Sequence, residues 1–478
     1  MKLHTLLVRK LMLHFDLIII GAGPAGEKAA AKASYFGKKV ALIEMAEAPG
    51  GAGVHTGTLP SKTLKETAIF LSGKNDKGIF GVDKDLRRNA SIEDFYYRRD
   101  YVKRSEVDAI TKNIEKHKIS LFYGKAEFVN TNTVKVASDR ETILSGDFIL
   151  IATGSYPFRP SNIPFDGERI HDSDTILNLK RFPKSLCVLG AGVIGCEYTT
   201  IFGAMGIPVY LVDTRDEILP FLDSELSASL VEQMRKDGIQ VIFNSGLDKI
   251  NSPQKGEDDF EIVLTSGEKL KVDMFLFAAG RSGRTAGLKL EELGVTVGKR
   301  EAVEVNEHYQ TNMDNIYAVG DVIGFPALAS TSMDQGRIAV THMFATDGFD
   351  KLARIFPYGI YTIPEVSMVG LSEREAKEKN ISHLTGKAYY ADMPRGKILG
   401  AQDGFLKLVF EKQTQIILGV HIIGIQATEL INFGLSLVES KKTLNDVISI
   451  AFNFPTLHDL YKYAAYDGLG NLSGHKIK

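Results

Sequence analysis

The pattern of apolar and polar positions begins with two short apolar runs that flank an alanine-rich stretch. The run at 16–20 predicts a buried strand, and the stretch at 25–36 predicts the helix that follows it. The second run, at 40–43, leads to Glu44, which lies 23 residues after Gly21. A strand, a glycine loop, a helix and a second strand in this order predict a βαβ unit.

The same pattern returns further along the chain. Apolar runs at 186–189 and 209–212 flank another helical stretch, and the second run leads to Asp213. Asp213 lies 23 residues after Gly190, which repeats the spacing of the first unit. The repeat predicts two modules of one kind in series.

Each module has a later strand that ends on glycine, at 148–154 in the first and at 274–280 in the second. The first module is longer because it contains an added segment at 50–115, with helical patterns such as 61–71 and 98–118. We therefore expect this segment to be an insertion in the first module.

The pattern changes again near the C-terminus. From residue 356, alternating strands such as 406–412 and 416–424 are mixed with helices such as 427–440. This mixture predicts a separate α+β domain. We expect a first module at 1–155 and 285–355, a second module at 156–284, and the last domain at 356–478.

Charge and composition exclude several classes of protein. The chain has 57 basic and 59 acidic residues, and this balance argues against binding to nucleic acid or to an anionic membrane. An apolar content of 44% is enough for several packed cores and argues against disorder. No run of about 18 apolar residues predicts a membrane span.

Cysteine and histidine usage narrows the chemistry further. Cys187 and Cys196 are the two cysteines of the chain, too few for a disulfide framework or a cysteine-rich metal centre. The eleven histidines form no ligand-like cluster, so we expect no metal. Two reduced thiols fit a cytoplasmic protein. The basic, apolar start at 1–14 runs directly into the first strand and leaves no room for a cleaved signal, and Met12 is an alternative start.

Both modules carry a Gly-x-Gly-x-x-Gly loop between strand and helix, which is the context in which this motif binds a dinucleotide. The first glycine permits the turn, the second lets a pyrophosphate approach, and the third lets the helix pack on the strand. Free N–H groups at the start of the helix then attract the phosphates. The candidate residues are Gly21, Gly23, Pro24, Ala25 and Gly26 in the first loop, and Gly190, Gly192, Val193, Ile194 and Gly195 in the second.

The acids that follow each loop indicate the nucleotides. Glu44 and Asp213 are expected to bind the hydroxyls of an adenosine ribose, which in the second module favours NAD over NADP. Arg215 lies two residues further on and either meets a 2′-phosphate or is a solvated loop cation. We expect a resident FAD in the first module and a visiting NAD or NADP in the second.

Together with other segments, these motifs resemble the pyridine nucleotide–disulfide oxidoreductases, flavoproteins that bind two dinucleotides. The resemblance covers the chain from Asp16 onwards and is strongest to the soluble transhydrogenases. It implies an α/β fold with two Rossmann-like domains, one for FAD and one for NAD(P), a C-terminal α+β dimerisation domain and a homodimer. The strings that carry it are GTLPSKTL (57–64), GAGVIGCEY (190–198), TRDEILPFLD (214–223), YAVGDVIGFPALAS (317–330), GIYTIPEVSMVG (359–370) and FNFPTL (452–457).

The resemblance implies roles for individual residues. Lys62 would reach the reactive edge of the flavin and Glu197 would pair with it beside the nicotinamide, although a surface lysine and a helix-dipole glutamate are the simpler interpretations. Asp321 would bind the ribityl or pyrophosphate part of FAD, or cap a helix, or do both. The resemblance also implies dinucleotide contacts at Gly51, Thr58, Ala126, Thr153, Gly154, Gly280 and Ala329.

The departures from the family pattern decide the chemistry. Gly53 and Thr58 stand where disulfide-reducing relatives carry their two redox cysteines, and Phe454 stands where they carry a histidine. His458 is expected to be a surface histidine. Cys187 and Cys196 are expected to be core residues rather than substitutes for the missing pair.

His55 lies where the dithiol side of the flavin would be. It either donates a proton to a second substrate or fills the space left by the cysteines.

These observations predict an enzyme that transfers hydride through FAD between NADPH and NAD+, without a dithiol. The nicotinamide nucleotides would be its substrates, and one site would serve both in turn. One alternative is an NAD(P)H-dependent reductase of a quinone or another non-disulfide acceptor. A second alternative is a non-catalytic flavoprotein that serves as a binding module.

Overall fold

The computed structural model describes residues 13–76, 78–87, 89–251, 259–401 and 403–475. These residues form two compact units. The described residues of Met1–Pro60, Arg99–Phe158 and Gly280–Leu352 form the first unit, and those of Ser61–Arg98, Arg159–Ala279 and Ala353–Lys478 form the second. Within the described residues, no helix is both long and apolar enough to cross a bilayer.

The first unit is built on one large sheet. Its central strand, β1 (Leu13–Ile20), begins three residues before the predicted strand because it pairs with β6 from Leu13 onwards. The strand order is β3 (Ser120–Tyr123), β2 (Val40–Glu44), β1, β6 (Thr142–Ile151), β5 (Thr133–Ala137) and β4 (Lys125–Asn130), and β17 (Ile316–Ala318) pairs with β6.

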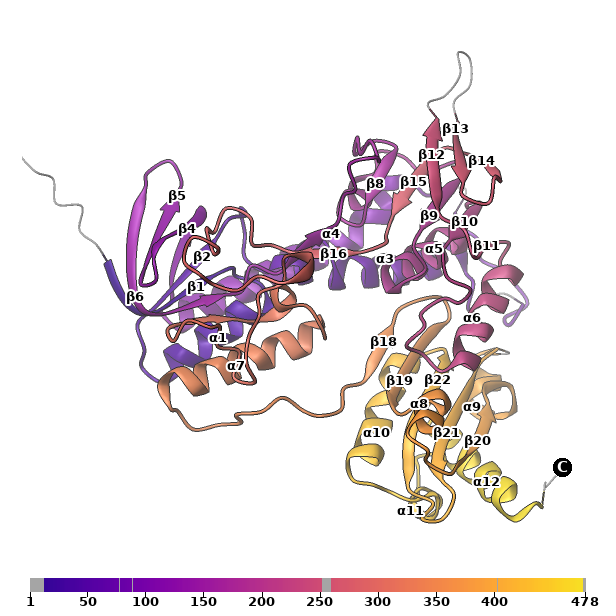
Figure 1. Cartoon of the computed structure of the whole chain (residues 1–478). Coiled ribbons are helices and arrows are strands. Elements are labelled where there is room, and N and C mark those ends of the chain that lie inside the picture. The colour runs from indigo at the N-terminus through magenta and orange to yellow at the C-terminus, as the bar shows by residue number, and fades with distance from the viewer. Residues whose placement is uncertain (1–12, 77, 88, 252–258, 402, 476–478) are drawn as a thin grey trace, which may run out of the picture. The chain divides into compact units, whose positions relative to one another are not determined.

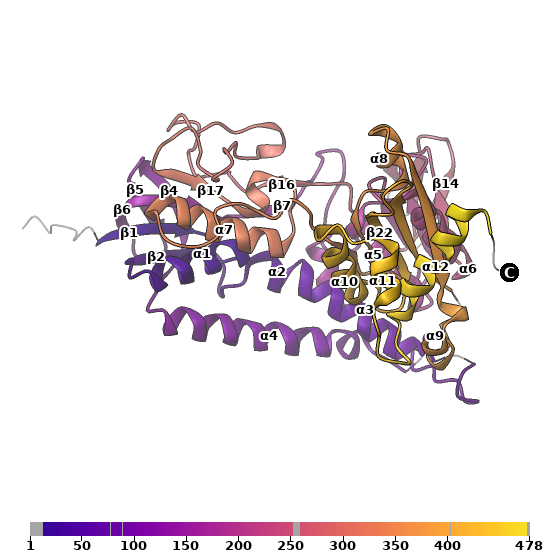
Figure 2. The same cartoon turned by 90° about the horizontal axis from the view of Figure 1, so that it is seen from below.

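The pleat of β1 sends alternate side chains to opposite faces of this sheet. Leu17 and Ile19 belong to a core shared with helices α1 (Pro24–Tyr35) and α7 (Ala329–Phe344). Ile18 and Ile20 belong to a second core on the other face. Helices α1 and α7 lie side by side along the sheet in Figure 1 and Figure 2. Strands β1, β2, β3, β6 and β17 run parallel, as βαβ connections require.

Short elements complete the first unit. Strands β7 (Ser155–Pro157) and β16 (Arg281–Gly283) form an antiparallel ribbon. The remaining elements are α2 (Gly51–His55), η2 (Lys299–Glu301) and η3 (Gly320–Ile323).

Two helices run across the division between the units. They are α3 (Thr58–Ser72) and α4 (Ile92–Lys116). Helix α4 begins six residues before the helical pattern at 98–118, because Ser91 and Asp94 exchange bonds at its start: Asp94 N donates to Ser91 Oγ at 3.1 Å and Ser91 N donates to Asp94 Oδ2 at 2.9 Å.

The second unit contains the second module. Its parallel sheet has the order β11 (Gln240–Ile242), β10 (Val209–Val212), β9 (Leu186–Leu189), β15 (Met274–Phe277) and β8 (Ile170–Asp172). Helices α5 (Val193–Ala204) and α6 (Ser224–Lys236) belong to this module, with η1 (Thr175–Asn178). An antiparallel sheet of β12 (Leu247–Asn251), β13 (Phe260–Leu264) and β14 (Lys269–Val272) accompanies it.

The C-terminal part of the second unit is an antiparallel sheet with helices. The strand order is β18 (Tyr358–Ile360), β19 (Glu365–Gly370), β22 (Ile417–Gly424), β21 (Phe405–Glu411) and β20 (His383–Tyr389). The other elements are α8 (Glu373–Glu378), η4 (Tyr390–Asp392), α9 (Pro394–Ile398), α10 (Ala427–Glu439), α11 (Leu444–Ser449) and α12 (Asp459–Ser473).

The described residues of the segment at 61–98 belong to the second unit. Leu64 and Phe95 are buried in the same core as Val188 of β9 and Phe202 of α5. The expected insertion at 50–115 is therefore shared between the units, because Leu64 and Phe95 pack in the core of the second unit whereas Ile114 packs in a core of the first.

Candidate functional site

The first glycine loop is shaped by contacts that exclude any side chain. Gly21 has φ +109°, and a Cβ there would lie 2.3 Å from the carbonyl oxygen of Ala152. A Cβ on Gly26 would lie 1.9 Å from the carbonyl oxygen of Gly21. Helix α1 begins at Pro24 after Gly23, which has no side chain to cap the free N–H groups. These groups can therefore bind an anion, and the loop fits a dinucleotide pyrophosphate.

Glu44 lies at the end of β2 and is almost completely buried. Its Oε2 accepts a bond from Ala22 N at 3.0 Å, and its Oε1 accepts one from Ala46 N at 2.8 Å. A carboxylate has about four acceptor positions, so two are left for the hydroxyls of a ribose.

The second glycine loop repeats this construction. Gly190 has φ +110°, and a Cβ on Gly195 would lie 1.8 Å from the carbonyl oxygen of Gly190. Gly192 differs, because a Cβ there would have no atom of the described structure within 4 Å. Helix α5 begins directly after it, at Val193. The open space at the start of α5 fits the phosphates of a second dinucleotide.

Asp213 follows β10 and occupies the position that corresponds to Glu44. Its Oδ2 accepts a bond from Ala191 N at 2.6 Å, and its Oδ1 accepts one from Arg215 N at 2.9 Å. Burial alone would raise the pKa of Asp213, but its bonds with Arg215 and Ala191 outweigh this effect and hold the pKa below its usual range.

Asp321 lies in the first turn of η3, where Val319 is the capping residue and makes no side-chain cap. The capping role considered for Asp321 is therefore wrong for this turn. Instead, Asp321 Oδ2 accepts a bond from Ser155 Oγ at 3.0 Å. Arg281 Nε donates to the same Oγ at 2.9 Å, so a serine and an arginine that the sequence did not single out position this carboxylate.

The other predicted dinucleotide contacts lie in the first unit or at the start of α3. Gly51 packs against the first loop, because a Cβ there would lie 2.7 Å from Gly23 Cα. Thr153 Oγ1 is buried without a hydrogen-bond partner among the described residues. Gly154 and Gly280 have open space beside them, Ala126 lies in β4, Thr58 begins α3 and Ala329 begins α7.

Lys62 of α3 and Glu197 of α5 form the ion pair that the resemblance implies. Lys62 Nζ donates to Oε1 of Glu197 at 2.7 Å and to Oε2 at 2.9 Å. Ser61 Oγ donates to the same Oε2 at 3.2 Å. The Glu197 side chain is 4% exposed and that of Lys62 is 24% exposed, so the lysine is the partner that can reach a ligand.

A third residue, Tyr361, contacts both members of this pair. It precedes β19 in the C-terminal part. Its backbone N–H donates to Glu197 Oε1 at 3.1 Å, and its ring centre lies 4.8 Å from Lys62 Nζ. A cation over a ring face is attracted to it, so Tyr361 holds both members of the pair. The string GIYTIPEVSMVG contains Tyr361, but nothing in its pattern indicates this contact.

A second ion pair lies one helical turn further along α3. Lys65 Nζ donates to Glu365 Oε1 at 2.6 Å, and Glu365 Oε2 accepts bonds from Thr428 N at 3.0 Å and Thr428 Oγ1 at 2.8 Å. Burial alone would lower the pKa of Lys65, but Glu365 and the adjacent Glu66 outweigh this effect and the pKa is raised. This pair fastens α3 to the C-terminal sheet and so supports the position of Lys62.

His55 ends α2, and its Nε2 is 2.9 Å from the carbonyl oxygen of Pro49. This bond favours the space-filling role of His55 over the proton-donating one.

Cys187 and Cys196 are completely buried and free, as expected for core residues. Burial raises the pKa of Cys187 to about 12 and also raises that of Cys196.

The positions of the family's thiol machinery hold other groups. Gly53 lies against the ring of Pro24, with 3.1 Å from an added Cβ to Cγ. Phe454 is 67% exposed. The expectation for His458 holds only in part: it is half-buried, its ring packs against Phe433, Phe452 and Tyr461, and this burial lowers its pKa.

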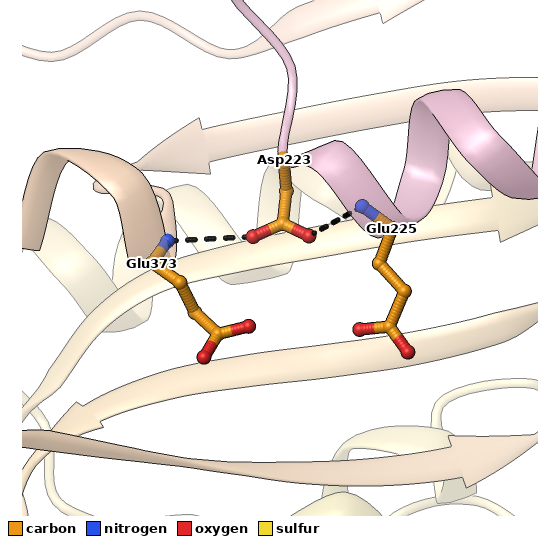
Figure 3. Close-up of side chains that lie close together, drawn as sticks. All are labelled: Asp223, Glu225 and Glu373. Atoms are coloured by element: carbon orange, nitrogen blue, oxygen red, sulfur yellow. Dashed lines mark hydrogen bonds between the residues drawn. The ribbon is translucent and has the colours of Figure 1, made fainter.

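Three carboxylates, those of Asp223, Glu225 and Glu373, lie close together in the second unit (Figure 3). Asp223 accepts the backbone N–H groups of both Glu225 and Glu373, which joins the start of α6 to the start of α8. The buried Lys407 Nζ donates to all three side chains. Burial alone would lower the pKa of Lys407, but the carboxylates raise it to about 12. The Lys407 ammonium therefore offsets part of the negative charge of the three acids, and Lys387 Nζ also bonds to Glu225.

Comparison with known protein families gives two matches. The model described as pyridine nucleotide-disulphide oxidoreductase matches residues 15–336, and the model of the family's dimerisation domain matches residues 356–465.

Known proteins and structures agree with these matches. The chain is 39% identical to the soluble pyridine nucleotide transhydrogenase of Mycobacterium tuberculosis, over 96% of this chain and 98% of that protein. It is 40% identical to the transhydrogenase of that name from Azotobacter vinelandii, over 96% and 99%. The HOCl-induced flavoprotein disulfide reductase RclA of Escherichia coli, solved as a Cu(II) complex, has a TM-score of 0.85 at 26% identity, over 95% of this chain and 99% of that one. LpdA of Mycobacterium tuberculosis has the same fold, with a TM-score of 0.86 at 24% identity over 95% and 99%. With both family models matched and full-length relatives near 40% identity, the chain belongs to the pyridine nucleotide-disulphide oxidoreductase family.

Proposed function

We propose that this protein is an FAD-dependent transhydrogenase, which passes hydride between NADPH and NAD+. The observation that carries the proposal is the identity of 39–40% to soluble pyridine nucleotide transhydrogenases along almost the whole of both chains. The chain also has a glycine loop with its acid in each module, and Gly53 and Thr58 stand at the dithiol positions. Electrons would therefore pass between the nucleotides by way of the flavin alone.

The first module would hold FAD. The N–H groups at the start of α1 bind its pyrophosphate, Glu44 binds its adenosine ribose, and Asp321, fixed by Ser155, binds its ribityl region. Bound FAD supplies a ring that accepts a hydride and returns it. The role of the protein is to hold the two nucleotides in position and to adjust the charge around the ring.

The second module would hold NADPH and NAD+ in turn. The start of α5 binds their phosphates, and Asp213 and Arg215 lie at the ribose end. Lys62 brings a positive charge that favours negative charge in the site, and Glu197 balances that charge when the site is neutral. Pairing with Glu197 therefore weakens the electrostatic attraction between Lys62 and negative charge in the site.

We place the active protein in the cytoplasm as a homodimer formed through its C-terminal part. The match of the dimerisation domain to residues 356–465 supports the dimer. Two free, buried cysteines support a reducing compartment.

The test is anaerobic reduction of the purified holoenzyme with NADPH, followed by separate additions of NAD+ and a soluble quinone. We expect NADPH to bleach the flavin absorbance and NAD+ to restore it directly. Restoration by the quinone orders of magnitude faster than by NAD+ at cellular concentrations would favour the quinone reductase. A bound flavin that NADPH does not bleach would favour the non-catalytic module.

A further inference from the structure

The two modules place an acid at the same position but surround it differently. Glu44 accepts two backbone N–H groups, and Asp213 accepts the two equivalent ones. The side chain of Arg215 adds two further bonds to Asp213, from Nε to Oδ1 at 2.9 Å and from Nη2 to Oδ2 at 2.8 Å. The residue at the corresponding place in the first module is Ala46, whose side chain has no group to donate.

This difference affects nucleotide binding because a carboxylate has a limited number of hydrogen-bond acceptor positions. A carboxylate offers about four, two on each oxygen. On Asp213, one backbone N–H and one Arg215 nitrogen fill both positions of each oxygen. On Glu44, two positions stay open. The two hydroxyls of a ribose can therefore bind to Glu44 as it stands, but they can bind to Asp213 only after Arg215 has left.

The paired Arg215 is itself suited to a phosphate. A guanidinium has five N–H donors, and the pair with Asp213 uses two of them, so three remain. The Arg215 side chain is 43% exposed, whereas that of Asp213 is 6% exposed, so arginine is the partner that faces a ligand and can move. Pairing also balances the charge of Asp213, which would otherwise repel a 2′-phosphate.

The neighbouring acid Glu217 acts on Arg215 through its charge, but its hydrogen bonds go to a different arginine. Glu217, two residues further on, accepts hydrogen bonds from both terminal nitrogens of Arg374, at 3.1 Å and 2.9 Å. Asp213 is therefore the carboxylate that decides where Arg215 lies.

We propose that Arg215 is the residue that switches the second module between its two nucleotides. Paired with Asp213, it forms the subsite for the 2′-phosphate of NADP(H). Released from Asp213, it exposes the carboxylate that binds the ribose of NAD(H). This inference rests on the proposed function, and it gives one nucleotide site two states that suit the two substrates in turn.

The experiment measures nucleotide binding rather than turnover. Oxidised NAD+ and NADP+ are titrated separately into the FAD-loaded protein by isothermal titration calorimetry, for the wild type and for Arg215→Ala. We expect the Kd for NADP+ to rise at least tenfold, because a charged hydrogen bond is lost. We expect the Kd for NAD+ to fall about threefold, because a partly exposed ion pair no longer has to open.

Two further variants make the result decisive. Arg215→Gln keeps part of the side chain without its charge and should change both Kd values in the same directions. Arg235→Ala removes an exposed arginine from the last turn of α6 and should change neither Kd value. If the wild type binds both nucleotides but the Kd for NAD+ stays unchanged or rises in Arg215→Ala, the proposed switch is wrong and the proposed function still stands. If the wild type binds neither nucleotide, the proposed function fails with it.

Discussion

The ammonium of Lys62 lies 4.8 Å from the centre of the Tyr361 ring, while the backbone N–H of Tyr361 donates to Glu197, the partner of that lysine. A residue of the C-terminal part thus holds both members of an ion pair formed by α3 and α5. The chemistry proposed for Lys62 therefore depends on a contact that no motif of the sequence contains.

The first prediction concerns this ring. Tyr361→Leu keeps the backbone bond to Glu197 but removes a cation–π contact worth about 0.5–2 kcal/mol. We expect flavin reduction by NADPH to slow about threefold to tenfold in stopped-flow absorbance, with FAD retained. Tyr361→Phe keeps a ring and is the matched control, so its rate should stay within about twofold of wild type. Equal losses in both variants would assign the effect to the hydroxyl instead.

The second prediction concerns the ion pair itself. Lys62→Met should lower the rate of flavin reduction at least tenfold while FAD remains bound. A tenfold loss corresponds to an activation free energy that is higher by about 1.4 kcal/mol. Glu197→Gln should shift the reduction potential of the flavin upwards, because the unbalanced lysine favours the negatively charged reduced ring. The double variant should lose less than the sum of the two single losses, and strict additivity would show that the residues act independently.

The fold and the ends of its nucleotide loops were predictable because they follow from local rules. Runs at 186–189 and 209–212 match β9 and β10 residue for residue, and each glycine loop ends a strand and begins a helix. The order of apolar runs, glycines and polar residues along the chain is enough to predict these features. The pairing of Lys62 with Glu197, by contrast, was predicted only through the family resemblance.

Contacts between distant segments were not predictable, because one sequence without its fold does not show which surfaces meet. The links from Ser155 to Asp321 and from Tyr361 to Glu197 each span more than 160 residues. The assignment of 61–98 to the second unit and the ring contacts of His458 were missed for the same reason. A half-polar helix such as α3 does not show from its sequence which of its faces will be covered.

The third prediction is that catalysis needs no thiol. Cys187→Ala with Cys196→Ala should keep the rate of NADPH-driven flavin reduction within about twofold, with a loss in stability of about 1 kcal/mol for each substitution. With a pKa of about 12, the Cys187 thiol is ionised at pH 8 to about one part in ten thousand. A disulfide reagent such as DTNB should therefore react only after unfolding. Rapid labelling of the folded protein, or loss of flavin reduction in a folded double variant, would contradict this prediction.

The fourth prediction concerns the buried ammonium of Lys407. Lys407→Met removes the cation that Asp223, Glu225 and Glu373 share, although Glu225 keeps its bond from Lys387. The substitution should lower the free energy of unfolding at pH 7 by about 3–5 kcal/mol in urea titrations. Lys236→Met, on the exposed end of α6, is the control and should change it little.

The pH dependence of stability should also change sign. In the wild type, Asp223 and Glu225 have lowered pKa values, so they stabilise the fold above their unfolded values of about 4 and lose this effect as the pH falls through the folded values. In Lys407→Met, Asp223 loses the ammonium and still faces two carboxylates, so its pKa should rise, and protonation between about pH 6 and pH 4 should recover stability. A wild-type slope that persists in the variant would show that the cluster does not control acid unfolding.

The last prediction is that NADPH and NAD+ use one site in turn. The chain has a single glycine loop for a nicotinamide nucleotide, at Gly190 to Gly195, so double-reciprocal plots should give parallel lines and each nucleotide should inhibit competitively against the other. Gly192→Ala tests the shared site directly. A Cβ there meets no atom of the described structure within 4 Å, and φ at Gly192 is −79°, so the variant should fold and keep FAD. Its methyl group would nevertheless occupy the space where the phosphates approach α5, which should raise the KM for NADPH and for NAD+ by the same factor. If flavin reduction by NADPH were lost while reoxidation by NAD+ persisted, the protein would have a second nucleotide site, and direct exchange at one site would be excluded.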